Sequence, residues 1–308
     1  MFEQLKGIEK EREEKTRKNV LESILKMCDV IVKKYTKKVK HDGFEAIEGN
    51  FKTYKQVMKT LKDLPEYTEA DLMSFIHAKA NAENPFEQDK DTLKKAVAQG
   101  LYSGCLLDLL AIRNREKGVP TNFYFDGKNN HFHYLFHLSH EADMIMLENL
   151  QGKRICYGAC NYGNKTKTFI ARNIEVNALL NYVALHNLID ICILENIKGT
   201  HIHTNISIQE NTGIDLMIIR NISGDGAFIH TSLEGNNTIK TLLYENSSIK
   251  NVSPSHVQNI ISFEYVRKQL KGHHYNKILD LVDSFEGKTP KEKIATADKI
   301  HTIYQKNV

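Results

Sequence analysis

The spacing of apolar side chains divides the chain into three segments. Up to residue 118 apolar residues recur at helical intervals, whereas from 119 to 251 short β-rich runs alternate with Asn and Gly. From residue 252 the helical spacing returns. We therefore expect a helical domain (1–118), a repeat domain (119–251) and a C-terminal helical segment (252–308).

Residues that commonly begin or break helices and strands mark the individual elements. Thr68 and Asp71 fit a capping box, Asp91 is expected to cap a long helix, and Thr289-Pro290 and Ser253-Pro254 each supply a cap with a first-turn proline. Asp126-Gly127 lies between two β-rich runs and predicts a hairpin turn. The predicted helices span about 4–40, 51–63, 68–80, 91–118, 253–271, 274–285 and 290–306.

A charged residue followed by Asn recurs through the repeat domain. The pairs are Glu148-Asn149, Arg172-Asn173, Glu195-Asn196, Arg220-Asn221 and Glu245-Asn246. They are 24, 23, 25 and 25 residues apart, and the sign of the charge alternates at every step. Such a period indicates stacked units, each too short to contain a crossover helix. We predict an α+β protein, in which a parallel β-helix (a single-stranded solenoid with about 24 residues per coil) is flanked by N- and C-terminal helical segments.

Stacking the coils gives both members of each pair a structural role. Asn tolerates left-handed backbone angles at a corner, and its amide can bond the same amide one coil away. Each charged side chain lies between two opposite charges, which favours the correct register. We expect these ion pairs to be exposed and therefore worth about 0.2–1 kcal/mol each.

The strand that precedes each charged residue is apolar on both faces. Two columns are predicted: Met146, Ile170, Ile193, Ile218 and Leu243, and Ile145, Phe169, Cys192, Met217 and Leu242. A strand that is apolar on both faces must be covered. Either the helical segments of this chain or a second protomer supply that cover.

Composition is that of a globular protein, with 41% apolar and 26% charged residues among 308. The sequence shows no signal peptide and no apolar run long enough for a membrane span, and its five cysteines lack CxxC spacing, so we expect a reduced, cytoplasmic protein. The basic residues of segment 1–40 are able to contact nucleic acid. Because Glu residues interleave them, a solvated helix face is the favoured interpretation.

Histidine offers the first candidate chemistry. His131 and His133, and again His201 and His203, have the H-x-H spacing that places two imidazoles on one face of a strand, as metal sites require. His230 falls one coil beyond His201 and His203, and Cys156 is predicted in the same outward register. If these residues form a site, His201, His203, His230 and Cys156 would bind a metal ion as cofactor. The favoured interpretation is that they are solvated polar residues on the outer wall of the coil.

Asp190 and Asp215 offer the second candidate chemistry. The repeat stacks them one coil apart, with Lys167 and Lys240 in the same column. Paired carboxylates on the wall of a β-helix suit carbohydrate chemistry. A second charge ladder explains the same column without any catalysis and is favoured.

Residues 122–251 resemble the right-handed parallel β-helix proteins in strand alternation, Asn corners and period. The helical segments on either side also resemble the layout of the Suf-type scaffold proteins of iron–sulfur cluster assembly. These resemblances imply an architecture and no particular site. Three functions stay open: a non-enzymatic scaffold or interaction protein with a protein partner or as a homo-oligomer, a metal or iron–sulfur assembly scaffold, and a carbohydrate-active enzyme. The first is the leading prediction.

Overall fold

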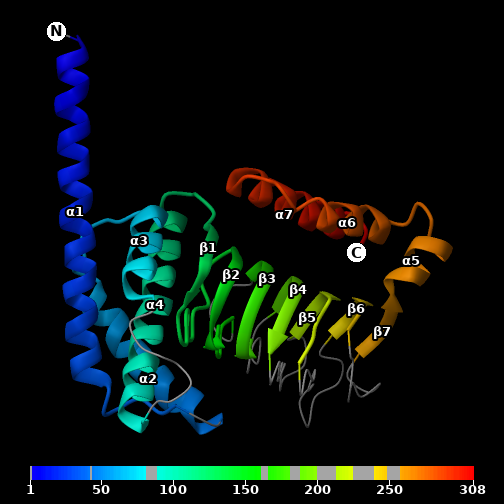
Figure 1. The fold of residues 1–308 in the computed structure, drawn as a ribbon, viewed down its shortest axis with the longest axis horizontal. Helices are drawn as coiled ribbons and strands as arrows, with labels where there is room; N and C mark the ends of the chain where they lie inside the picture. The colour runs from blue at the N-terminus through cyan, green and yellow to red at the C-terminus, as the bar shows by residue number, and fades with distance from the viewer. Residues whose placement is uncertain are drawn as a thin grey trace.

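The structure is a computed structural model that describes residues 2–41, 44–80, 89–160, 166–180, 188–199, 213–224, 239–247 and 257–308. A layer of helices, a β-solenoid and a second group of helices follow one another along the chain (Figure 1). The helices are α1 (Phe2–Tyr35), α2 (Phe44–Leu61), α3 (Glu69–Lys79), α4 (Lys90–Glu116), α5 (Phe263–Gln269), α6 (His274–Asp283) and α7 (Pro290–Gln305). The strands are β1 (Asn122–His131), β2 (Met144–Ile155), β3 (Thr166–Leu179), β4 (Leu188–Gly199), β5 (Gly213–Arg220), β6 (Ile239–Glu245) and β7 (Val257–Ser262).

The seven strands pair in parallel and in chain order, with about 24 residues per turn of the solenoid. The predicted columns are confirmed by the register. Met146 pairs with Ile170 and Ile193 with Ile218, while the adjacent column pairs Phe169 with Cys192. The predicted parallel β-helix architecture with flanking helices is therefore correct.

Asparagine bends the strands as predicted. Asn149, Asn173 and Asn196 have positive φ angles of 51°, 52° and 54° within β2, β3 and β4. Asn221 and Asn246 directly follow β5 and β6 with φ of 53° and 46°. Left-handed backbone at one residue turns the chain sharply, and Asn accepts this conformation more readily than most residues. Each coil therefore turns its corner at the Asn of the repeat.

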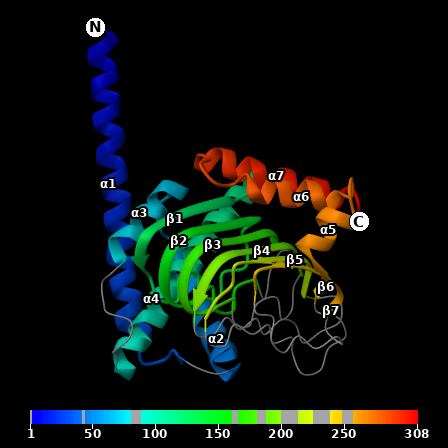
Figure 2. The same cartoon turned by 45° about the vertical axis from the view of Figure 1, so that its right-hand side comes forward.

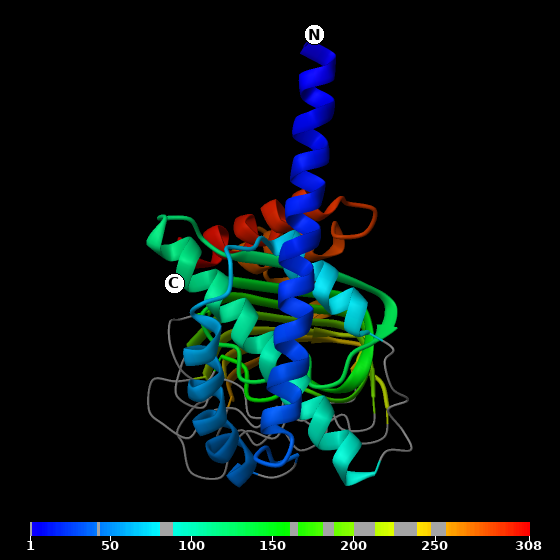
Figure 3. The ribbon, with the colours of Figure 1, turned by 90° about the vertical axis from the view of Figure 1, so that its left-hand side faces the viewer.

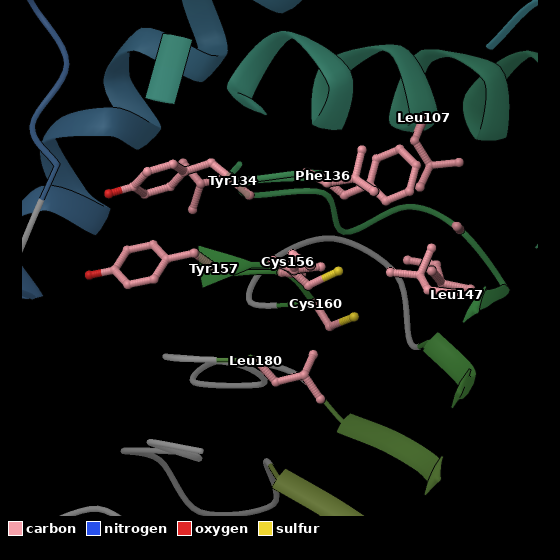
Figure 4. Packing of buried hydrophobic residues seen from close by; sticks show 14 of the residues in the cluster. Leu107, Tyr134, Phe136, Leu147, Cys156, Tyr157, Cys160 and Leu180 are labelled. Carbon is pink, nitrogen blue, oxygen red and sulfur yellow. The ribbon is translucent and has the colours of Figure 1, made fainter. Parts of the chain in front are cut away.

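The bore of the solenoid is filled by apolar side chains, including Leu147, Cys156 and Leu180, which point toward one another (Figure 4). The same buried cluster continues into the helical layer, where Leu107 of α4 belongs to it. The helices before the solenoid therefore share one continuous hydrophobic core with its interior.

Helix α4 lies directly against the first coil, and the helical layer covers this end of the solenoid (Figure 3). A Cβ atom added at Gly100 would lie 2.2 Å from the carbonyl oxygen of Tyr134, and one added at Gly104 would lie 2.3 Å from that of His137. The two glycines thus permit close packing of α4 against the first coil. Among the described residues α4 is the one helix with the length and composition to cross a membrane, but 78% of its apolar stretch is buried, as befits a core helix.

The C-terminal helices cover the outer face of the sheet (Figure 2). Met146, Ile170, Ile193 and Ile218 form a second buried cluster with side chains of α5, α6 and α7, such as Phe263, Leu279 and Ile300. Of the two covers left open by the sequence, the chain therefore uses its own helical segments. This face needs no second protomer to remove it from water.

Two predicted elements are wrong in type. The helix expected at 253–271 is a strand over Val257–Ser262, which pairs with β6, and α5 begins only at Phe263. Its N-cap is Ser262, whose hydroxyl accepts a hydrogen bond from the Tyr265 N–H at 3.2 Å. Pairing in a further coil outweighs the helical spacing because the backbone groups of this strand that face β6 gain hydrogen-bond partners there. Residues 253–256 lie outside the described part of the chain.

The hairpin expected at Asp126-Gly127 is also absent from β1. The strand runs through these residues and pairs in parallel with β2, and its register shifts between Asp126 and Asn130. Lys128 and Asn129 have positive φ, so the turn signal produces an irregularity inside a strand. At the start of α4, the cap is Asp89, which accepts hydrogen bonds from the Asp91 and Thr92 N–H groups, and not Asp91 itself.

Candidate functional site

The alternating charged residues form a ladder of ion pairs on the outer face of the sheet. Arg172 lies between two glutamates: its Nη1 is 2.7 Å from Glu148 Oε1, and its Nε is 2.5 Å from Glu195 Oε2. Glu195 in turn pairs with Arg220, and Glu245 occupies the next register position. The predicted alternation is confirmed.

The expected exposure of this ladder is wrong. Glu148, Arg172 and Glu195 are only 1%, 3% and 4% exposed, because the C-terminal helices lie over them. Their charges are removed from water, so each ion depends on its partners far more than it would at the surface. These three members of the ladder therefore lie in the interior of the protein, whereas Arg220 and Glu245 are partly exposed.

The C-terminal helices join the ladder through charged side chains of their own. Lys293 of α7 pairs with Glu148, and Asp283 of α6 pairs with Arg220. Glu286, in the connection between α6 and α7, lies 3.6 Å from Arg172. The alternating charges thus hold the C-terminal helices on the sheet, and their role in this structure is structural.

The asparagines form a second ladder beside it. The Nδ2 group of Asn173 donates to Asn149 Oδ1 at 3.2 Å, and Asn196 donates to Asn173 at 2.8 Å. In the next two coils, Asn221 donates to Asn196 Oδ1 at 2.8 Å and Asn246 donates to Asn221 Oδ1 at 3.3 Å. At the first coil Asn149 donates to Asp126 Oδ1 at 3.0 Å, so a carboxylate ends the series.

Asp190 and Asp215 occupy one register position in neighbouring coils, since Ile189 pairs with Ile214 and Ile191 with Leu216. The structure therefore brings the two carboxylates together, as predicted. They are only 3% and 5% exposed. A groove for a polysaccharide is absent at these two described residues.

Each of these carboxylates has a basic partner. His301 of α7 places its Nε2 2.9 Å from Asp190 Oδ2, and Lys240 places its Nζ 2.6 Å from Asp215 Oδ1. Burial, together with Asp215, raises the pKa of the nearby Tyr304 phenol. The column holds α7 on the sheet and resembles the second charge ladder that the sequence favoured.

Cys156 is not on the outer wall, so its predicted place is wrong. Its side chain is fully buried in the bore, and burial raises the pKa of its thiol well above the ordinary value. The thiols of Cys160 and Cys192 are likewise buried, and burial also raises their pKa. Protonated thiols in an apolar core are poor metal ligands.

The histidines proposed with it, His201, His203 and His230, lie outside the described residues. Within the described ranges, no group of three or more His, Cys, Asp or Glu side chains is placed to hold a metal ion. The metal site at these positions stays a prediction.

Sequence reasoning missed a buried polar cluster around Asp108 of α4. The Asp108 carboxylate is fully buried and accepts hydrogen bonds from the Tyr54 hydroxyl (2.7 Å), the Ser139 hydroxyl (2.8 Å) and the backbone N–H groups of His140 and Glu141 (each 2.9 Å). Burial raises the pKa of this carboxyl, and His140 and these hydrogen bonds oppose the shift. The sequence signal for this cluster is Asp108 itself, a single carboxylate within the apolar run Leu106–Leu110.

A second buried histidine, His137, makes polar contacts of its own near this cluster in the chain. His137 places its Nδ1 2.6 Å from the Tyr157 carbonyl oxygen and its Nε2 3.0 Å from Asn50 Nδ2. Burial lowers the pKa of His137 to about 4, so its imidazole is neutral at pH 7. The Ser139 hydroxyl donates to Asp108 and not to an imidazole, so the cluster lacks the nucleophile–base contact of a hydrolase. It joins α2 and α4 to the first coils.

Comparison with known proteins finds no family model, no curated protein and no solved structure that matches this chain. Function must therefore be inferred from the geometry described above.

Proposed function

We propose that this protein is a non-enzymatic interaction protein, which binds another protein chain through the projecting part of α1. The observation that carries the proposal is the position of this helix: its N-terminal part stands clear of the helical layer and of the solenoid (Figures 1 and 3). At 1.5 Å per residue, the 34 residues of α1 extend over about 50 Å.

The sequence of this projecting part supports a helix that needs no packing partner in its own chain. Glu11, Glu13 and Glu14 each precede a basic residue by four positions, namely Lys15, Arg17 and Lys18. This is the favourable orientation for pairs along a helix, each worth about 0.2–0.5 kcal/mol. A sequence this rich in charged residues favours a partner of complementary charge.

The closed outer face of the sheet also supports an interaction role. Asp190 and Asp215 are the carboxylates that a carbohydrate-active enzyme of this architecture would use, and both are buried beneath α7. The ladder of Glu148, Arg172 and Glu195 is likewise committed to the docking of the C-terminal helices. The described outer face of the sheet is therefore occupied by the protein's own helices, which leaves the projecting part of α1 as the proposed binding surface.

The test uses the full chain with a photo-crosslinking residue at position 10, on the projecting part, or at position 59, on the exposed side of α2. In its native host cells we expect a discrete adduct from position 10 and none from position 59. The captured protein is then purified, and its affinity for the unmodified chain is measured by calorimetry.

The double variant Glu11→Lys/Glu14→Lys reverses two charges on the projecting part of α1, and we expect it to weaken binding of the captured protein about tenfold. The control is Glu22→Lys, an exposed position of α1 nearer to the helical layer, which should leave binding unchanged. Identical adducts from both positions, or binding that survives the charge reversal, would contradict the proposal. A hydrolytic activity that is lost in Asp215→Asn would favour the carbohydrate-active alternative.

A further inference from the structure

We propose that a small basic pocket at the junction of the helical layer and the first coil binds a phosphate group. The pocket has a volume of about 100 Å³. A cavity needs about 10–15 Å³ of such volume to hold one water, so this space admits a group of several heavy atoms. It is lined by Val32 of α1, Lys79 of α3, Lys95, Ala96 and Gln99 of α4, and His131, Phe132 and His133 at the end of β1.

The polar groups that line the pocket favour an anion. They belong to two lysines, two histidines and one glutamine, and none of the lining residues is acidic. Ammonium groups and N–H donors are what phosphate oxygens bind. Lys79 and Lys95 would repel a metal cation, so the H-x-H pair at His131 and His133 suits an anion better than the metal expected from its spacing.

The backbone of the next coil fixes the tautomer of His133. Its Nδ1 accepts a hydrogen bond from the Lys153 N–H at 3.0 Å and therefore carries no proton. In the neutral imidazole the proton then lies on Nε2, which makes that nitrogen a donor. His133 is only 9% exposed, so its ring is held in place by the surrounding coil.

Lys79 is also positioned before any ligand arrives. Its Nζ lies 2.8 Å from Asp29 Oδ1, and the Asp29 side chain is 72% exposed, so this is a surface pair of low strength. A phosphate dianion at the pocket can share the Lys79 ammonium without displacing a buried partner. The Gln99 amide, which donates to the Lys79 carbonyl oxygen at 3.5 Å, links α3 to α4 at the same place.

The lining residues come from α1, α3, α4 and β1, so the pocket exists only where the helical layer meets the solenoid. Buried neighbours such as Val97 and Ala98 fix the α4 side of this junction. The inference is independent of the proposed interaction function, because it uses none of the projecting part of α1.

The test is a titration of the full chain with inorganic phosphate, followed by NMR of the histidine ring protons and by calorimetry, in a buffer of low ionic strength. We expect saturable shifts of the His131 and His133 signals at millimolar phosphate or below, and no such shifts with sodium chloride at equal ionic strength. Lys95→Gln should weaken binding about tenfold or more, since it removes a charged donor. Lys94→Gln, the neighbouring lysine outside the pocket, should leave affinity unchanged.

Urea denaturation of both variants separates loss of binding from loss of folding. Equal weakening by Lys94→Gln and Lys95→Gln would show general attraction to a basic surface and would overturn the proposal. Absence of saturable shifts, or tighter binding of Zn²⁺ than of phosphate at His131 and His133, would overturn it as well.

Discussion

The side-chain amide of Asn196 donates to the amide oxygen of Asn173, one coil earlier, at 2.8 Å. Both residues have left-handed backbone, with φ of 54° and 52°. One residue type thus turns the strand and links the coil to its neighbour. The repeated Asn is for this reason a feature of the architecture.

Replacement of Asn196 tests both roles. We expect Asn196→Ala to lower the free energy of unfolding by roughly 2 kcal/mol, from about 1 kcal/mol for left-handed backbone and a similar amount for the lost amide bonds. Asn196→Gly removes the same amide but tolerates positive φ, so it should lower the stability less. Urea denaturation measures both variants, and a glycine variant that is less stable than the alanine variant would refute the backbone role.

The buried ion ladder predicts a large effect at Arg172. We expect Arg172→Met to lower the free energy of unfolding by about 3–5 kcal/mol, because Glu148 and Glu195 then lose a buried partner. The control is Glu175→Gln, which breaks a pair with Lys198 that is more than half exposed on both sides and should change stability by less than about 1 kcal/mol. Similar effects from the two variants in urea denaturation would contradict the burial of the ladder.

His137 predicts how stability depends on pH. The pKa of its imidazole is about 4 in the folded protein and 6.5 ordinarily, so between these values the unfolded chain binds more protons. Its contribution to stability is therefore complete above pH 6.5 and is lost as the pH falls toward 4, by roughly 3 kcal/mol in total. His137→Gln should flatten this part of the profile of unfolding free energy against pH. A profile that stays unchanged in His137→Gln would contradict this assignment.

Helix α7 covers the sheet through Ile300, which is fully buried. We expect Ile300→Ala to lower the stability by about 2–4 kcal/mol and to accelerate amide hydrogen exchange in α7. Lys299→Ala, at the adjacent exposed position, is the matched control and should leave exchange unchanged. Equal exchange in the two variants would indicate that α7 is not held by the second hydrophobic cluster.

The spacing of residues along the repeat was sufficient to predict much of the candidate site. The spacing of Glu148, Arg172 and Glu195 predicted the stacking of their side chains, and the columns of Met146 and Ile145 predicted two buried faces. Such patterns work because each coil repeats the same backbone path, so equal spacing along the chain becomes adjacency in space.

Other features required contacts between distant parts of the chain. Cys156 lies in the bore because the chain leaves β2 through residues with positive φ, such as Arg154 and Cys156 itself, and there the alternation of strand faces no longer applies. Asp108 lies in an apolar helix stripe, and only the packing of α2 and of residues 139–141 shows that its carboxylate is fully hydrogen-bonded.

By itself the sequence determined the period, the register of the coils and the corners at Asn, because these follow from residues at fixed intervals. Only the tertiary structure decided which element covers the outer face. Lys293 and Glu148 meet across 145 residues of sequence, and their contact turns an expected surface ladder into a buried one. Periodicity describes which side chains share a face, whereas burial depends on the segment that packs against that face, and this is a property of the whole fold.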